Sequence, residues 1–381
     1  DVYYPPLRLS GSQMVSPNRL DNGALVVELN SLGLLDVTVK ETGKTYRNLH
    51  LLEDRSDAGE GWNWRPVRYD SAVYGDNALE QFQVTADGPF CTVWKLTYSV
   101  KLPHGLAADG IHRGEGEKFQ RVTTWLTIPK DSEQLTFRTV VENETENHRL
   151  RVLFPTELKT DCFYTKTPFD MAKWPVAHPD NRHHVELETK VHPSQGVTWM
   201  TDGKDCAAMY AKGLYEVEVT DNEERAMALT LFRAAQHETG TCHPEDIKML
   251  RKMEFEYALD FGTAEQAAAL AEGEAYRAGV RSYHFEQNPA AGPLGPTGQM
   301  LEISGDQIVS AIFEDSGRTY VRLYDVSGKD GQCNLTFPRK VKGAQYVNLN
   351  LEPQSDAAFD KNSVTLSCPA HKIVTVAVEV E

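Results

Sequence analysis

Two tryptophans two residues apart are the first residues of this chain whose types and spacing could bind a ligand. They belong to the stretch Trp62-Asn63-Trp64-Arg65-Pro66. Residues i and i+2 of an extended segment share a face, so both indoles could stack on a sugar ring while Asn63 or Arg65 hydrogen-bonds its hydroxyls. Trp and Arg are also enriched at the centres of protein interfaces. The stretch therefore predicts a sugar contact, a domain interface or plain core, and the sequence leaves these three open.

An acidic cluster around one arginine is the second candidate. The segment Asp221-Asn-Glu-Glu-Arg225 lies between two alternating segments, residues 215–219 and 227–231, which predicts a hairpin turn. Carboxylates beside a guanidinium also form a hydrogen-bonding cluster of the kind found at the edge of a binding site. Asp221 and Arg225 are therefore candidate binding residues.

The remaining polar motifs predict neither a metal site nor a catalytic pair. The histidines of His237-Glu-Thr-Gly-Thr-Cys-His243 are six residues apart, whereas a zinc-binding helix needs a spacing of four, so we expect a polar loop. Asp54-Arg-Ser-Asp-Ala-Gly59 departs from a calcium loop and is expected to form a turn with local hydrogen bonds, or a loop that packs on a partner domain or sugar site. Since nucleophile-elbow, P-loop and dinucleotide motifs are also missing, we assign no catalytic residue, metal ligand or cofactor to this chain.

Composition limits the partners and the location. The 381 residues carry a net charge of −16, which disfavours binding to nucleic acid and to anionic membranes. No apolar run approaches the roughly 20 residues of a membrane span. The six cysteines are scattered without a CxxC pair, which favours reduced thiols in a cytoplasmic, bacterial protein. The first residue is Asp1 rather than Met, and we expect a fragment of a longer polypeptide. The oligomeric state stays open, a homo-oligomer included.

Alternation of apolar and polar residues dominates the chain and predicts short strands separated by Gly, Pro, Asn and Asp. No helical segments alternate with these strands, which argues against a parallel α/β fold. We expect a mainly β chain with a large antiparallel β-sandwich at 1–286, a Gly/Pro linker at 287–299 and a small β-sandwich at 300–381. The expected strands include residues 25–29, 35–39, 92–100, 120–128, 135–141, 150–154, 255–259, 308–313, 320–324 and 372–380.

One segment has the composition of a helix. Thr263-Ala-Glu-Gln266 matches a capping box, in which the Gln266 side chain reaches back to the Thr263 amide. Residues 264–278 are rich in Ala and Glu, which favour helix. We therefore expect one short helix near 263–278.

Several motifs resemble, in the same order, the C-terminal β-region of family 38 glycoside hydrolases, the α-mannosidases. Asn22–Glu28 and Lys40–Gly43 come first, and Leu51–Gly59 follows. Leu150–Thr156 then ends a buried strand at Pro155. Thr167-Pro-Phe-Asp170 follows and presents Phe169 and Asp170 on a loop, and Glu254–Leu259 continues the order. The resemblance extends over most of the chain.

This resemblance implies a large sandwich of the galactose-mutarotase-like type and a parent enzyme that is a zinc-dependent retaining α-mannosidase. In that family a helical domain and a catalytic barrel, which holds the zinc and an Asp nucleophile, precede the β-domains. The chain is then expected to be inactive alone and to pack against those N-terminal domains. The resemblance implies a sugar-site edge formed by Arg225, Asp221 and Trp62, and domain-interface residues Trp64, Phe169 and Asp170. The alternatives are a free-standing carbohydrate-binding β-sandwich and a mutarotase-like enzyme.

Overall fold

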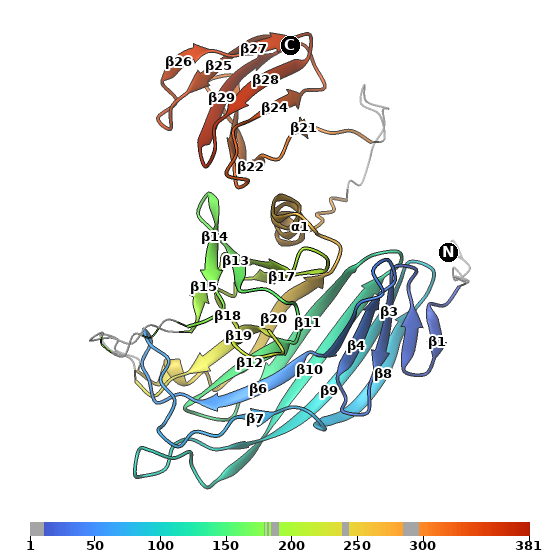
Figure 1. Cartoon of the computed structure of the whole chain (residues 1–381), viewed down its shortest axis with the longest axis vertical. Helices are drawn as coiled ribbons and strands as arrows, with labels where there is room; N and C mark the ends of the chain where they lie inside the picture. The colour runs from blue at the N-terminus through green and yellow to red at the C-terminus, as the bar shows by residue number, and fades with distance from the viewer. Residues whose placement is uncertain (1–10, 179, 181–182, 184–189, 238–243, 285–296) are drawn as a thin grey trace. The chain divides into compact units, whose positions relative to one another are not determined.

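The computed structural model describes residues 11–178, 180, 183, 190–237, 244–284 and 297–381. This part of the chain is mainly β, with several antiparallel sheets and one α-helix (Figure 1), as the sequence predicted. Contacts group it into two compact units: Asp1–Thr165 with Lys173–Ala264, and Lys166–Ala172 with Glu265–Glu381. The expected division at 286 and 300 had placed the helix in the first unit, whereas the contacts group it with the second. Most of the expected linker lies outside the described residues.

A nine-stranded antiparallel sheet dominates the first unit, in the order β14-β13-β16-β17-β20-β11-β10-β9-β8. Its longest ladder pairs Glu117 with Pro103 and continues to Pro129 opposite Cys91. Apolar residues at every second position of these strands, such as Trp94 and Leu96, are fully buried, because alternate side chains of a strand face the same side. The strands are β8 (Leu79–Asp87), β9 (Cys91–Pro103), β10 (Glu117–Pro129), β11 (Gln134–Glu142), β13 (Cys162–Thr167), β14 (Asp170–Pro175), β16 (Val197–Thr201), β17 (Cys206–Lys212) and β20 (Lys252–Asp260).

Two smaller sheets complete the first unit. One has five strands in sequence order, and the other has six in the order β15-β18-β19-β12-β6-β7. The five are β1 (Met14–Ser16), β2 (Arg19–Asp21), β3 (Leu25–Leu29), β4 (Leu35–Val39) and β5 (Thr45–Leu49). The six are β6 (Leu51–Ser56), β7 (Val73–Tyr74), β12 (His148–Phe154), β15 (His192–Pro193), β18 (Glu216–Val219) and β19 (Met227–Ala234). A 3-10 helix, η1 (Pro244–Lys248), precedes β20.

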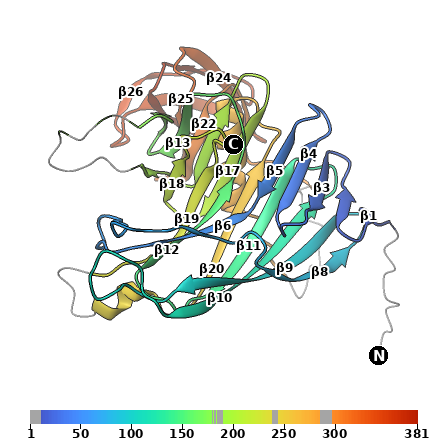
Figure 2. The same cartoon turned by 60° about the horizontal axis from the view of Figure 1, so that its bottom comes forward.

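One hydrophobic core joins all three sheets of the first unit. It contains Val27 from the five-stranded sheet, Leu126 and Phe137 from the nine-stranded sheet and Val152 from the six-stranded sheet. Figure 2 shows β3, β4 and β5 beside the long strands that they cover. Each fully buried side chain of this size contributes about 1.5–3 kcal/mol. The large β-sandwich predicted from the alternation is therefore confirmed.

A histidine lies inside this core. His50 is fully buried, stacks on Phe137 with ring centroids 5.3 Å apart, and its Nε2 lies 2.9 Å from the Tyr257 hydroxyl. Burial in apolar surroundings lowers the pKa of His50 to about 4. The side chain is therefore neutral near pH 7.

The polar stretch from Asp54 to Gly59 was wrongly predicted to begin as a turn. Asp54, Arg55 and Ser56 are the last residues of β6, which pairs with β12 from Leu51↔Leu153 to Ser56↔His148. Polar side chains can occupy a buried strand when partners across the sheet satisfy their hydrogen bonds. The local sequence does not predict this strand, because the partners of its polar side chains are 59 to 98 residues away along the chain.

The predicted helix is present as α1 (Gln266–Ala278), but the predicted capping box is wrong. The N-cap residue is Glu265, and it makes no side-chain capping bond. The Thr263 carbonyl instead accepts a 2.8 Å hydrogen bond from the Trp199 indole, and the Thr263 hydroxyl has no partner in the described part of the chain. A long-range contact thus fixes Thr263 ahead of the helix.

The second unit contains a small sandwich of two antiparallel sheets, as predicted. A four-stranded sheet has the order β21-β24-β28-β27, and a five-stranded sheet has the order β22-β23-β29-β25-β26. Val321, Leu335, Val364 and Val376 lie at the centre of their shared core. The strands are β21 (Glu302–Ser304), β22 (Ile308–Asp315), β23 (Arg318–Tyr324), β24 (Gly331–Thr336), β25 (Val341–Val347), β26 (Pro353–Asp356), β27 (Ala358–Asp360), β28 (Ser363–Cys368) and β29 (Ile373–Val380).

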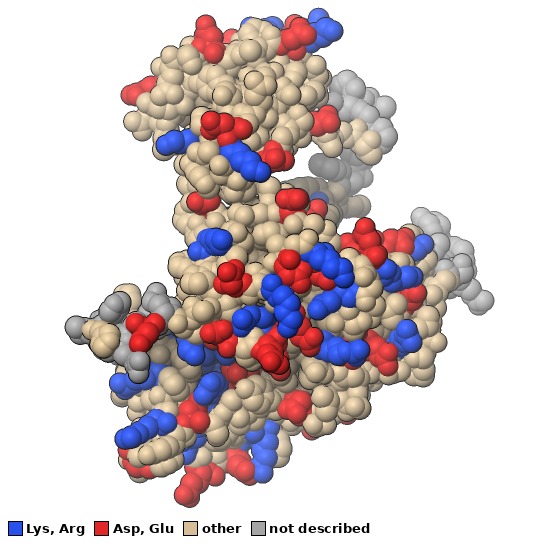
Figure 3. Space-filling view, viewed as in Figure 1, with Lys and Arg blue, Asp and Glu red and all other residues tan. Residues whose placement is uncertain are grey.

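Positive and negative side chains are interspersed on the face drawn in Figure 3. Several form exposed pairs across the nine-stranded sheet, such as Arg138 with Glu254 and Lys212 with Glu256. Screened pairs of this kind contribute little to stability. None of the helices in the described ranges has the length and apolar character that crossing a bilayer requires.

Candidate functional site

A polar hollow of about 720 Å³ lies where three connections of the first unit meet. They are the loop after β12, the turn between β16 and β17, and the turn between β18 and β19. The predicted hairpin between β18 and β19 is confirmed, with Val219 opposite Met227. The lining residues are Leu158, Lys159, Thr160, Asp161, Thr201, Asp202, Asp221, Asn222, Glu223 and Arg225.

The loop that lines one side of this hollow begins where β12 ends, directly before Pro155, as the sequence predicted. Proline has no N–H for the sheet, and the next two amides, of Thr156 and Glu157, donate to the Glu224 carbonyl at 3.0 and 2.8 Å. The Thr156 hydroxyl donates to the Arg225 carbonyl at 2.9 Å. Loop and hairpin turn are thereby bonded to each other, which fixes the wall that carries Arg225.

Arg225 and Asp221, both predicted as binding residues, are brought together in this hollow. Nη1 of Arg225 donates to Asp221 Oδ1 at 3.1 Å and to the Asn222 carbonyl at 2.8 Å. No other nitrogen of this guanidinium makes a hydrogen bond within the described residues. The backbone of Arg225 has φ of 45°, which a side-chain-bearing residue adopts at a cost. The guanidinium thus both closes its own turn and keeps donors for a ligand.

Asp202, in the turn between β16 and β17, also lines the hollow. Burial alone would raise the pKa of Asp202, but the N–H groups of Asp205, Lys204 and Lys159 outweigh it and lower the pKa. The hollow therefore presents ionised carboxylate beside Lys159 and Arg225. Acceptors and donors in such a mixture suit an uncharged, hydroxyl-rich ligand. Lys159 and Asp202 were not predicted as site residues, because nothing in their local sequence indicates that the fold brings them together.

Trp62, the third predicted sugar-edge residue, is not in this hollow. It lines a second hollow of about 260 Å³ with Trp64, Val191, His192, Pro193, Tyr215 and Glu216. Trp62 is 80% exposed and Tyr215 is 63% exposed. The structure therefore separates the three predicted residues into one polar and one aromatic site.

Trp64 differs from Trp62 because it is anchored. Its indole donates to the Ser56 carbonyl at 3.0 Å and covers the Arg149 guanidinium, whose central carbon is 3.5 Å from the ring centroid. Arg149 is 1% exposed, and its Nε and Nη1 have no hydrogen-bond partner within the described part of the chain. Burial, and next the charge of Arg151, lower the pKa of Arg149 to about 9.

Arg149 stands in a row of three arginines across the six-stranded sheet. It is directly opposite Arg55 on β6 and Arg233 on β19. Two aspartates of the connection after β6 hold the outer members: Asp70 binds Arg55 at 2.8 Å, and Asp57 binds Arg233 at 2.9 Å. The connection between β6 and β7 thus neutralises both flanks of the buried cation.

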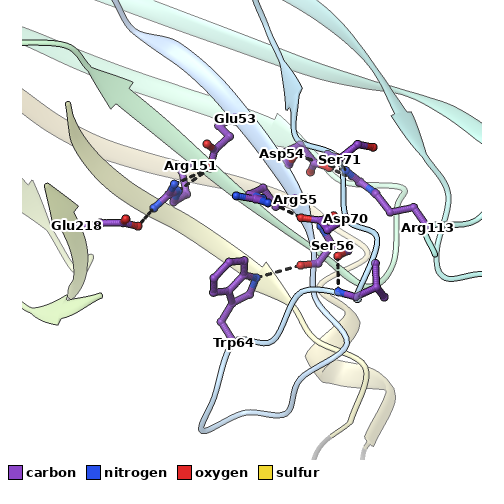
Figure 4. A network of polar contacts seen from close by, with 11 residues as sticks. Glu53, Asp54, Arg55, Ser56, Trp64, Asp70, Ser71, Arg113, Arg151 and Glu218 are labelled. Carbon is purple, nitrogen blue, oxygen red and sulfur yellow. Dashed lines mark hydrogen bonds and ion pairs between the residues drawn. The ribbon is translucent and has the colours of Figure 1, made fainter. Parts of the chain in front are cut away.

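Two buried ion-pair networks tie the same strands together (Figure 4). Arg151 donates to Glu53 at 2.6 Å and also binds Glu218. Asp54 binds Arg113 and the Nδ1 of His148. Removing one partner from a buried pair leaves an uncompensated charge. These residues have partners for all their charges and therefore form a scaffold.

Phe169 and Asp170, expected at a domain interface, lie at the tip of the β13–β14 hairpin, in the second compact unit. The Phe169 ring meets Tyr324 edge-on at 5.7 Å, and Asp170 lies 3.7 Å from His371. Both contacts are to the small sandwich of that unit. Their role as interface residues stays a prediction.

Metal ligands were not expected. Within the described residues, no group of three or more His, Cys, Asp or Glu side chains could hold a metal ion. Cys242 and His243 of the polar loop lie outside the described residues.

The fold defines a mainly β region built of antiparallel sheets in two compact units. The family model for the glycosyl hydrolases family 38 C-terminal domain matches residues 20–241, and the chain belongs to this family. It is 21% identical over 313 residues to the "Putative mannosylglycerate hydrolase" of Halalkalibacterium halodurans, a match that covers 77% of this chain and 34% of that relative. The resemblance inferred from the sequence is confirmed.

Two solved structures share the fold. An α-mannosidase from Enterococcus faecalis V583 superposes with a TM-score of 0.82 at 21% identity, over 97% of this chain and 42% of that one. A family 38 glycosyl hydrolase protein from Enterococcus faecalis gives a TM-score of 0.81 at 20% identity, over 97% of this chain and 44% of that one. The chain thus spans between a third and a half of the length of these relatives.

Proposed function

We propose that this chain is the C-terminal, non-catalytic β-region of a family 38 α-mannosidase that hydrolyses α-mannosidic bonds. The observation that carries the proposal is the polar hollow formed by three sheet connections around Arg225. Membership of the family supports the parent activity. The coverage of 34% to 44% of the relatives supports a role as one part of a larger enzyme.

The chemistry of the hollow suits the edge of a mannose site. Sugar hydroxyls both donate and accept, so Asp202 and Asp221 can accept from them while Lys159 and Arg225 donate to them. A ligand that carries its own negative charge is disfavoured, since carboxylates outnumber the cations along the wall. We assign Arg225 and Asp221 to binding the uncharged sugar beside the catalytic barrel.

The test compares the chain alone with the polypeptide that includes the catalytic region. We expect no hydrolysis of an aryl α-mannoside by residues 1–381, and turnover by the isolated chain would refute the proposal. In the longer polypeptide, Arg225→Ala should lower kcat/KM about tenfold, or by about 1.4 kcal/mol of transition-state binding. Arg19→Ala, which removes a surface arginine 3.9 Å from Glu28, is the matched control and should leave kcat/KM unchanged.

Zinc belongs to the catalytic region in this proposal. The described residues of this chain do not fit a metal site, so we assign them no metal-dependent step. A chelator should abolish hydrolysis by the parent enzyme. The same chelator should leave the unfolding midpoint of the isolated chain unchanged, and a fall in that midpoint would place a metal in this chain.

The aromatic hollow is proposed as the contact with the N-terminal barrel and helical domain. Its support is the combination of exposed Trp62 and Tyr215 with half-buried Trp64, since large aromatic side chains anchor interfaces. Trp62→Ala should leave the melting temperature of the isolated chain unchanged and lower that of the longer polypeptide. A metal-independent sugar affinity of the isolated chain that Trp62→Ala abolishes would instead support a carbohydrate-binding β-sandwich.

We also propose that the parent enzyme is cytoplasmic. Among the described residues, the cysteines Cys91, Cys162, Cys206, Cys333 and Cys368 are free, which supports this location because thiols stay reduced there. Labelling of these thiols in intact cells before and after lysis tests it. Pairing of any of them as a disulfide in freshly lysed cells would contradict the proposed compartment.

A further inference from the structure

We propose that the small sandwich of the second unit carries a binding site of its own for a neutral pyranoside sugar. The site is a hollow of about 350 Å³ on the five-stranded sheet. The two hollows on which the proposed function rests lie in the first unit, so this inference stands apart from that proposal.

The floor of the hollow includes small residues on two paired strands, Gly343 and Ala344 on β25 and Ala377 on β29. Gly343 on β25 is opposite Glu379 on β29, and Gln345 on β25 is opposite Ala377 on β29. A β-bulge between Val341 and Gly343 displaces β25 at this point. Glycine and alanine have small side chains, so they leave a space on this face of the sheet.

The rim carries planar polar groups with free hydrogen-bonding capacity. Arg318 and Glu379 form an ion pair at 3.0 Å, which fixes both groups at one side. Gln345 is opposite Asp356 in the β25–β26 ladder, and neither side chain makes a hydrogen bond within the described ranges. An amide and a carboxylate side by side can donate to and accept from neighbouring hydroxyls.

An exposed aromatic ring completes the site. Phe359, on β27 of the other sheet, lines the hollow and is 45% exposed. An aromatic face attracts the CH groups of a pyranose ring and excludes water from one side of it. The floor residue Ala377 also packs with Tyr320, whose ring stacks on Phe313 at 5.2 Å.

Size and charge select the ligand class. The volume lies at the lower end of the roughly 300–1,000 Å³ typical of ligand sites and fits one sugar ring. The Arg318–Glu379 pair is neutral in sum, and Asp356 adds one negative charge, so an anionic ligand is repelled. Glu379 is paired with Arg318, so Asp356 is the one carboxylate left for a cation, and a divalent cation needs more charged oxygen ligands than this. A neutral ring with several hydroxyls satisfies all of these groups.

The experiment uses the full chain labelled with ¹³C in the alanine, leucine and threonine methyl groups and titrated with methyl α-D-mannopyranoside. We expect saturable shifts of the methyl signals of Ala344, Ala357 and Ala377, three residues of the hollow, in the presence of a chelator. Phe359→Ala and Asp356→Asn should each weaken binding about tenfold. Phe119→Ala, which truncates a 64% exposed ring on β10 of the first unit, should leave binding unchanged.

Three outcomes would overturn the inference. They are the absence of saturable shifts at these alanines, equal binding by the folded Phe359→Ala and Asp356→Asn variants, and equal binding of sorbitol, which has the hydroxyls but no ring. Saturable shifts confined to Leu158, Thr160 and Thr201 would place the sugar in the polar hollow of the first unit. That result would refute this inference without contradicting the proposed function.

Discussion

The central carbon of the Arg149 guanidinium lies 3.5 Å from the centroid of the Trp64 ring. This distance places a buried cation directly against an aromatic face, an arrangement worth roughly 2 kcal/mol when the cation is desolvated. Trp64 thereby takes the place of the hydrogen-bond partners that Arg149 lacks in the described part of the chain. The two neighbouring tryptophans consequently differ in what they contribute to the folded chain.

Replacing Trp64 should therefore destabilise the chain far more than replacing Trp62. Trp64→Ala exposes the buried guanidinium and removes the indole bond to Ser56, and we expect a loss of about 2–4 kcal/mol in the free energy of unfolding. Trp62→Ala is the matched control, since this indole is 80% exposed, and its effect should stay within about 0.5 kcal/mol. Urea unfolding followed by circular dichroism measures both, and equal losses would contradict the assigned roles.

Asp54 should be a sensitive carboxylate of β6. Asp54→Asn leaves Arg113 and His148 buried beside a neutral amide, and breaking a buried pair in this way destabilises by about 3–5 kcal/mol. Glu28→Gln breaks only an exposed pair with Arg19 and should change stability by less than about 1 kcal/mol. A difference of under 1 kcal/mol between the two variants in urea unfolding would show that the Asp54 network is dispensable.

His50 should make the chain less stable as the pH falls. Its folded-state pKa is about 4, lowered from 6.5 by burial. Between these values the unfolded chain binds a proton that the folded chain excludes, so stability is retained above pH 6.5 and lost as the pH falls towards 4. The loss from this residue is on the order of 3 kcal/mol.

The pH effect is measured by comparing variants at several pH values. His50→Gln should be less stable than the parent chain at pH 7.5 and lose less further stability between pH 6.5 and 4. His104→Gln, at an exposed position, should keep the pH dependence of the parent chain. Identical slopes for all three proteins would contradict the neutral, buried state of His50.

The start of α1 should accept a stabilising substitution. Glu265 occupies the N-cap with extended backbone angles and makes no capping bond, whereas Ser or Asp there can accept from the free amides of the first turn. Glu265→Asp should stabilise the second unit by about 0.5–1 kcal/mol. The comparison is Glu272→Ser, an exposed position within the helix, which should destabilise by a few tenths of a kcal/mol. Thermal unfolding that shows no gain for Glu265→Asp would contradict the assigned cap.

The fold could be predicted from the sequence wherever one face of a strand is buried. Residues 25–29 and 35–39 alternate in type and are β3 and β4 to the residue. β6 was not predicted, because its residues Glu53 and Asp54 are polar although they are buried. Only partners far along the chain make that burial favourable. The helix was predicted from composition, but its cap was not, because the contact of Thr263 with Trp199 overrides the local pattern.

The candidate site could be predicted only where its residues are neighbours in sequence. Asp221 and Arg225 lie on one hairpin turn, and the sequence identified both. Asp202 and Lys159 join them through the ends of other strands, and strand order cannot be deduced from alternation. Trp62 was grouped with them through resemblance, and the structure places it in another hollow.

The row formed by Arg55, Arg149 and Arg233 has a consequence for engineering chimeras. Like charges directly opposite one another on neighbouring strands repel, and here two carboxylates of a single connection, Asp57 and Asp70, offset that repulsion. The connection between β6 and β7 is therefore not an interchangeable surface loop. A graft from a distant homologue will be tolerated only if it brings two acids to the same places, however well its ends fit.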